Sequence, residues 1–98
     1  MPFEDFSTLT YLGKLKTTPS TQQANSRLGV GFECLDRDMW KVEQAWPVIE
    51  QLGIKWARVQ TGWAKTEQSP GVFDFTWLDE IVDKLIARSV TPWLSISY

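Results

Sequence analysis

The order of hydrophobic periodicities along the chain constrains its fold more than any other feature. Residues 76–88 carry apolar side chains at the spacing of an amphipathic helix, and the segments 54–60 and 90–98 on either side alternate like strands. The same pair of patterns occurs earlier, with a strand predicted over 28–34 and a helix over 41–52. Strand, helix, strand, helix and strand in this order predict an α/β fold with a parallel sheet and right-handed crossovers. The apolar stripe of the later helix consists of Trp77, Leu78, Ile81, Val82, Leu85 and Ile86.

The spacing of the predicted strands favours one kind of α/β fold. They begin at residues 28, 54 and 90, so the intervals are 26 and 36 residues. A (β/α)8 barrel of ~250 residues repeats every ~31 residues, which is close to the mean interval. A doubly wound sheet has a similar repeat, but no Gly-x-Gly-x-x-Gly turn follows the first strand here. We therefore predict the first βαβαβ portion of a TIM barrel, an incomplete barrel, and keep a nucleotide-linked α/β domain as the alternative.

The ends of the predicted helices carry their own signals. Thr76 and Asp79 fit the capping box, in which a hydroxyl caps the first amides and an acid reaches back. Arg88 lies in the last turn, where a cation interacts favourably with the helix dipole. Pro47 lacks an amide donor and is expected to disturb the earlier helix. Ser89 stands where a helix-ending glycine is expected.

Each predicted strand has one apolar face and one polar face, and the polar residues gather toward the carboxyl ends. Parallel α/β folds place their ligands at this end of the sheet. The opposite faces are apolar and are expected to meet the helices. The polar residues have an alternative interpretation, in which they only cap the end of an ordinary sheet. The polar set is Glu33 on the first strand, Arg58 and Gln60 on the second, and Ser95 and Ser97 on the third.

Composition and charge exclude several classes of function. The net charge is −2 and no basic stripe exists, so no nucleic-acid partner is expected. The chain has no histidine, which removes Ser-His-Asp chemistry and histidine metal sites from this segment, and we expect no metal and no cofactor. The single Cys34 cannot form an internal disulfide. No run approaches the ~18 apolar residues of a membrane span, and no secretory signal is recognisable, so a cytoplasmic location is expected.

Three segments carry a resemblance to a known group of enzymes. They are Leu-Gly-Ile-Lys-Trp-Ala-Arg, which ends at Arg58; the stretch from Trp63 to Asp79, with its Trp, Glu, Pro-Gly, Asp-Phe and Leu-Asp; and Pro-Trp-Leu-Ser-Ile-Ser-Tyr, which ends at Tyr98. In this order and spacing they resemble the opening of clan-A glycoside hydrolases, retaining (β/α)8-barrel sugar hydrolases. The likeness is greatest to the β-xylosidase-like members around glycoside hydrolase family 39.

The resemblance implies a mechanism for a whole enzyme. Retaining glycosidases use two carboxyl groups ~5–5.5 Å apart, one as acid/base and one as nucleophile. In the clan these groups come from strands 4 and 7, so both lie beyond Tyr98 and no catalytic residue is assigned here. The isolated chain is expected to be inactive. Arg58 matches the clan's second-strand arginine, which hydrogen-bonds and orients the nucleophilic carboxylate and keeps it ionised.

Other candidate site residues keep two interpretations each. Glu33 is expected either to accept hydrogen bonds from sugar hydroxyls or to pair with Arg58. Trp63 and Trp93 are expected either to stack on a sugar ring or to pack in the core. Gln60 shares the polar face with Arg58 and is expected to bind substrate or support the site.

The domain boundaries follow from the same patterns. Residues 1–27 are polar and lack a sustained period, so we predict an N-terminal arm, followed by a partial TIM-barrel glycosidase domain over 28–98. Three parallel strands expose two edges and a whole face, so self-association or pairing with the missing remainder of the barrel is expected. The predicted function is the N-terminal part of a hydrolase of O-glycosidic bonds, acting on a carbohydrate substrate, with β-xylosides as one candidate. The alternative is a non-catalytic carbohydrate-binding or self-associating α/β fragment.

Overall fold

A computed structural model describes residues 6–96 and contains the predicted parallel sheet. The strands are β1 (Gly29–Phe32), β2 (Trp56–Gln60) and β3 (Thr91–Ser95), paired in the order β1-β2-β3. Both pairings are parallel. The α/β class with a three-stranded parallel sheet is therefore confirmed, and this arrangement is consistent with the opening of a barrel. Residues 97 and 98 of the predicted third strand, including Ser97, lie outside the described residues.

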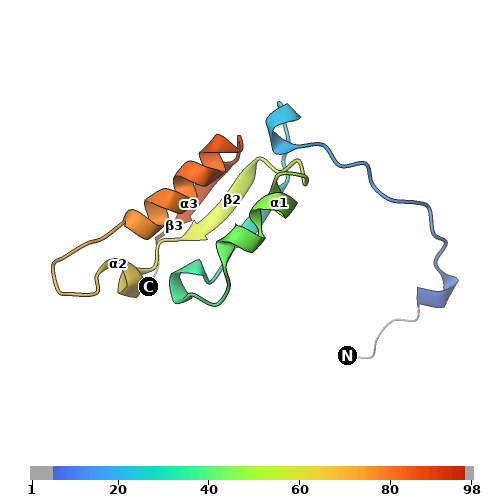
Figure 1. The fold of residues 1–98 in the computed structure, drawn as a ribbon. Coiled ribbons are helices and arrows are strands. Elements are labelled where there is room, and N and C mark those ends of the chain that lie inside the picture. The colour runs from blue at the N-terminus through green and yellow to red at the C-terminus, as the bar shows by residue number, and fades with distance from the viewer. Residues whose placement is uncertain (1–5, 97–98) are drawn as a thin grey trace.

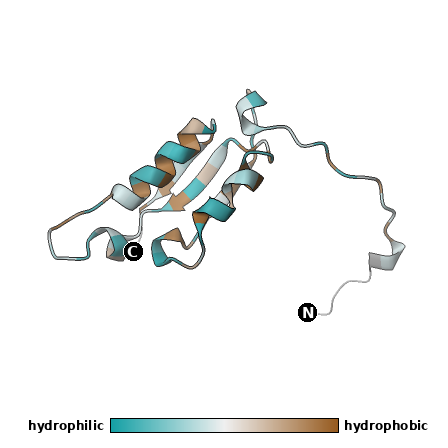
Figure 2. Ribbon diagram, viewed as in Figure 1, coloured by the Kyte–Doolittle hydropathy of each residue, from teal (hydrophilic) through white to brown (hydrophobic). Residues whose placement is uncertain are grey.

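The helices that connect the strands lie on one face of the sheet, and the other face is open (Figure 1). Helix α3 (Thr76–Ala87) connects β2 to β3 and matches the prediction closely. In Figure 2, hydrophobic positions recur along α3 between hydrophilic ones, as an amphipathic helix requires. The alternation of β2 sends Ala57 and Val59, both 0% exposed, toward the helices. The core lies between these layers and includes Phe32, Trp46, Ile49, Ile54, Leu78, Ile81, Leu85 and Val90.

The connection between β1 and β2 is less helical than its sequence predicts. In place of one helix over 41–52, a 3-10 turn (Val42–Gln44) precedes the one-turn helix α1 (Trp46–Ile49). Pro47 lies in the first turn of α1, where its missing amide costs no intrahelical bond. The proline therefore determines where the α-helix can begin, and the apolar residues Trp46 and Ile49 still reach the core.

The ends of α3 differ from the prediction in one respect. The prediction of a capping box is wrong, because Thr76 donates its hydrogen bonds to the carboxylate of Asp74 and not to that of Asp79. The distances to Asp74 Oδ1 are 2.6 Å from Thr76 Oγ1 and 2.9 Å from the Thr76 amide nitrogen. These bonds hold the pKa of Asp74 below its usual value. At the other end Arg88 donates to the Lys84 carbonyl at 2.9 Å. Ser89 adopts a left-handed φ of 60°, the conformation for which glycine was expected.

The N-terminal segment contacts the rest of the fold around one short turn. Residues 7–17, which follow the start of a 3-10 turn (Phe6–Thr8), are exposed and run away from the sheet (Figure 1). A second turn (Ser20–Gln22) is anchored near the amino end of β2, where Ser20 is 1% exposed. Its amide donates to the Glu50 carbonyl, and its own carbonyl accepts from Lys55 Nζ at 2.7 Å. None of the helices in residues 6–96 has the length and hydrophobicity needed to cross a bilayer.

Two neighbouring residues of α3 test how much the covered face contributes to stability. Leu85 is 0% exposed and Ile86 is 58% exposed. We expect Leu85→Ala to lower the free energy of unfolding by about 3 kcal/mol, because it removes buried methyl groups and leaves a cavity. Ile86→Ala, the matched control, is expected to cost less than about 0.5 kcal/mol. Urea denaturation followed by circular dichroism measures both, and equal losses would contradict the placement of α3.

Candidate functional site

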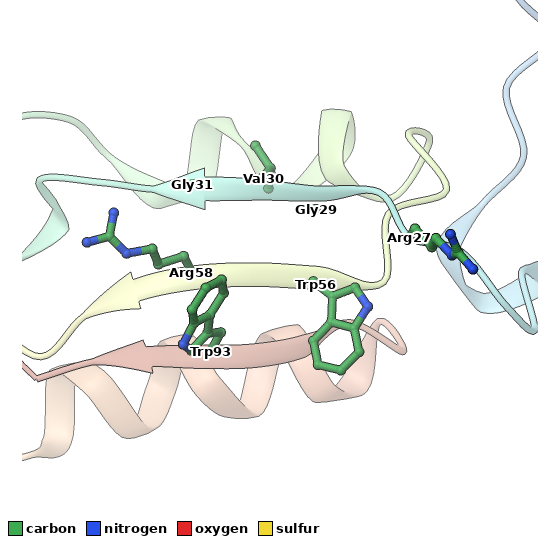
Figure 3. Close-up of a pocket in the computed structure, with 7 residues that line it drawn as sticks. All are labelled: Arg27, Gly29, Val30, Gly31, Trp56, Arg58 and Trp93. Atoms are coloured by element: carbon green, nitrogen blue, oxygen red, sulfur yellow. The ribbon is translucent and has the colours of Figure 1, made fainter.

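The open face of the sheet carries the candidate site. Figure 3 views this face and shows Trp56, Arg58 and Trp93 in front of the strands and the helices behind. The register places Gly31, Arg58 and Trp93 side by side on adjacent strands. Trp56 is 48% and Trp93 is 64% exposed. Neither tryptophan is a core residue. Of the two interpretations of Trp93, packing in the core is therefore wrong, and its ring is exposed to an external contact.

Arg58 connects side chains at the carboxyl ends of the three strands on this face. Its Nη1 donates to Glu33 Oε1 at 2.7 Å, and its Nη2 donates to Ser95 Oγ at 3.3 Å. Glu33 follows β1 and Ser95 ends β3, so Arg58 spans from one outer strand to the other. The side chains of Arg58 and Glu33 are 43% and 39% exposed. Glu33 was expected either to bind sugar hydroxyls or to pair with Arg58, and in the structure it forms the ion pair with Arg58.

Gln60 lies on the same strand as Arg58 but has a different environment. It is 6% exposed, and its Oε1 accepts a hydrogen bond from the Cys34 amide at 3.1 Å. Cys34 has a left-handed φ of 66° and begins the turn that follows β1. The Gln60 side chain therefore ties this turn to the end of β2, which is a supporting position and not an exposed binding position.

Trp63 belongs to a second apolar surface that is separate from Arg58. It opens the one-turn helix α2 (Trp63–Thr66), and it is 62% exposed. It lines a cavity together with Phe73, Phe75 and Ile96, and the rings of Phe73 and Phe75 stack with centroids 6.5 Å apart. The structure thus does not bring Trp63 together with Trp93. The two phenylalanines were visible in the sequence only as part of the resemblance segment.

A depression on the open face brings together the remaining residues of interest. Its volume is about 650 Å³, and the walls are mostly apolar. Trp56 was not predicted as a site residue, although it has the same strand phase as Arg58 and could have been found from it. Within the described residues no group of three or more His, Cys, Asp or Glu side chains could hold a metal ion. The lining consists of Arg27, Gly29, Val30, Gly31, Trp56, Arg58 and Trp93.

The loop after β2 is organised by the carboxylate of Glu67. Its Oε1 accepts from the Gly71 amide at 2.8 Å, and its Oε2 accepts from Trp63 Nε1 at 2.6 Å. Both bonds hold the pKa of Glu67 below its usual value, and the bond from the Gly71 amide has the larger effect. The carboxylate therefore fixes both the Pro70-Gly71 turn and the orientation of the Trp63 indole.

The close approach of the loops after β1 and β2 depends on Gly62. This residue has a φ of 57°, and a Cβ there would clash with the Cβ of Asp36. Gly62→Ala is expected to destabilise the protein by about 3 kcal/mol, through left-handed backbone strain plus the steric clash. Gly71→Ala is the control, since its φ is 77° but nothing lies within 4 Å, and it is expected to cost about 1 kcal/mol. Thermal and urea denaturation compare the two, and equal costs would contradict the proposed loop contact.

The lowered pKa of Glu67 makes the Trp63 contact dependent on pH. A carboxyl group whose pKa is lowered by folding stabilises the folded state above its unfolded pKa, about 4.3 for glutamate, and this contribution is lost as the pH falls through the lowered value. We expect the indole Nε1–H NMR signal of Trp63 to titrate with a midpoint below the ordinary glutamate pKa. Glu67→Gln should abolish the titration. A midpoint at or above the ordinary value would contradict the two hydrogen bonds.

Comparison with known proteins places the chain among sugar hydrolases. The family model for glycoside hydrolase family 42, described as beta-galactosidase, matches residues 32–95. This range includes β2, β3, the last residue of β1, and the aromatic residues that line the depression and the Trp63 cavity. This family is not family 39, so the comparison supports the broader likeness to clan-A glycoside hydrolases and not the narrower one.

A curated relative agrees with the family match. The chain is 31% identical over 67 residues to the beta-galactosidase BgaA of Clostridium cellulovorans, an alignment that covers 65% of this chain and 10% of the relative. The chain thus spans about a tenth of the length of that relative. No solved structure matches this chain significantly. Since the family model covers residues 32–95, well over half of the sequence, the chain belongs to glycoside hydrolase family 42, the beta-galactosidase family.

Proposed function

We propose that this chain supplies the first two βα units and the third strand of a retaining glycoside hydrolase that cleaves β-galactosides. The family description and the name of the relative support the substrate class. The single observation that carries the proposal is the placement of Arg58, fixed by Glu33 and Ser95 at the carboxyl end of the open sheet face. Substrate sites of (β/α)8 barrels lie at this end.

Arg58 has the chemistry to position a nucleophilic carboxylate. A guanidinium carries five N–H donors and stays protonated, so it can bind Glu33, Ser95 and a further carboxylate at once. Such a neighbour keeps a carboxylate ionised, as the retaining mechanism requires of its nucleophile. Neither the nucleophile nor the acid/base is assigned to a residue of this chain, and we expect the 98 residues alone to hydrolyse no glycoside.

The open face and the two outer strands support a proposal for what this chain binds. The edges of β1 and β3 have no further strand beside them among residues 6–96, and such edges pair readily with other strands. The proposed occupant is the remainder of a barrel, which would pair with both edges and enclose Trp56 and Trp93. Self-association of a non-catalytic fragment is the second candidate, favoured by the exposure of these two tryptophans.

A chimaera tests the proposed function and its substrate. Residues 32–95 of this chain replace the matching segment of BgaA, and hydrolysis of nitrophenyl β-galactoside and β-xyloside is measured. We expect activity on the galactoside to exceed that on the xyloside. Arg58→Met should lower kcat/KM by at least about 100-fold, because the nucleophile loses a charged partner in the transition state. A preference for the xyloside would support the β-xylosidase alternative instead.

Arg27 provides the matched control for Arg58. Both arginines line the same depression, but Arg27 precedes β1 and therefore lies at the amino end of the sheet, away from the proposed chemistry. Extending the replaced segment to residue 27 allows Arg27→Met to be compared, and it should leave kcat/KM within about twofold. Full activity of the Arg58→Met chimaera, or equal losses from both substitutions, would refute the role given to Arg58.

A further inference from the structure

Gly31 lacks a side chain where the carboxylate of Glu33 lies. A Cβ added to Gly31 would come within 3.0 Å of Glu33 Oε1 and 3.3 Å of Glu33 Cγ. The same Oε1 accepts the 2.7 Å hydrogen bond from Arg58 Nη1. The side chain of Glu33 therefore lies back along β1, over its neighbour two residues earlier on the same face, to reach Arg58 on β2.

The backbone does not require glycine at this position. The described glycines with a positive φ are Gly13, Gly53, Gly62 and Gly71, so Gly31 has a conformation that other residues adopt. The three heavy atoms nearest to an added Cβ all belong to Glu33, so the missing side chain leaves room for the Glu33 side chain. The nearest atom is at the far end of a flexible side chain, so a methyl group would shift the carboxylate by a few tenths of an ångström at little cost to the fold.

We propose that Gly31 and Glu33 form a positioning unit that fixes the guanidinium of Arg58 for the carboxylate of a later strand. This inference rests on the proposed function and deepens it. Arg58 is 43% exposed on an open face, and a long side chain in such a place loses substantial rotamer entropy when it is ordered. Contacts from both outer strands, to Glu33 and to Ser95, order it before the reaction. Glu33 acts through Arg58 and is not a catalytic residue.

A double-mutant cycle on the 98-residue chain tests the geometric part. The readout is the separation of the Arg58 Nη1 and Nη2 signals in 15N NMR, which is large when the guanidinium is held and small when it rotates freely. We expect Gly31→Ala and Glu33→Ala each to reduce the separation. In the Glu33→Ala background, Gly31→Ala should have no further effect, because the displaced carboxylate is absent. Additive effects, or an unchanged signal in Gly31→Ala, would overturn the proposal.

Kinetics of the chimaera, with its replaced segment covering residues 31–95, test the functional part. Gly31→Ala and Glu33→Gln are each expected to lower kcat about tenfold while KM stays within about twofold, since the loss concerns orientation in the transition state. An active chimaera that depends on Arg58 but is indifferent to both substitutions would overturn the positioning unit alone. An active chimaera that is indifferent to Arg58→Met would refute the proposed function, whatever the NMR cycle gives.

Discussion

The packing of the central strand against the helices is the interaction on which the rest of the structure depends. Ala57 and Val59 of β2 are fully buried, and β2 pairs with both β1 and β3. Because side chains alternate along a strand, burying these two residues places Arg58 on the opposite, open face. A slip of one residue in β2 would bury the guanidinium and expose the core, so register is fixed by the same burial that positions the arginine.

Polar contacts at the carboxyl end convert this framework into a candidate site. Arg58 joins the strand ends through Glu33 and Ser95, while Gln60 holds the turn that begins at Cys34. These groups come from all three strands or the residues just after them. The family membership gives this geometry a context, since barrel glycosidases bind substrate at the carboxyl ends of their strands. The aromatic surface around Trp63 lies in the loop after β2 and is organised separately by Glu67.

Sequence patterns predicted the elements whose local and tertiary preferences agree. The apolar stripe of residues 76–88 became α3 (Thr76–Ala87), and the alternation of 54–60 became β2 (Trp56–Gln60) with the expected faces. They failed where several local signals compete. The segment 41–52 contains Pro47 within an otherwise helical period, and the outcome was a 3-10 turn and a single α-helical turn. The start of α3 was predicted to be capped by Thr76 and Asp79, and only the folded loop shows that Asp74 accepts the hydrogen bonds from Thr76.

The sequence by itself determined the class of fold, the faces of the strands and the likeness to sugar hydrolases, because these depend on periodicity and on the order of short segments. Which side chains meet was decided by the tertiary structure. From the sequence, Glu33 could either contact a sugar or form an ion pair with Arg58. The parallel register of β1 and β2 brought its carboxylate to Arg58. Trp63, in the loop after β2, lines a different cavity from Trp93. The contacts of Arg58 with Glu33 and Ser95 join residues 25 and 37 positions apart; they depend on strand pairing, and no local pattern records them.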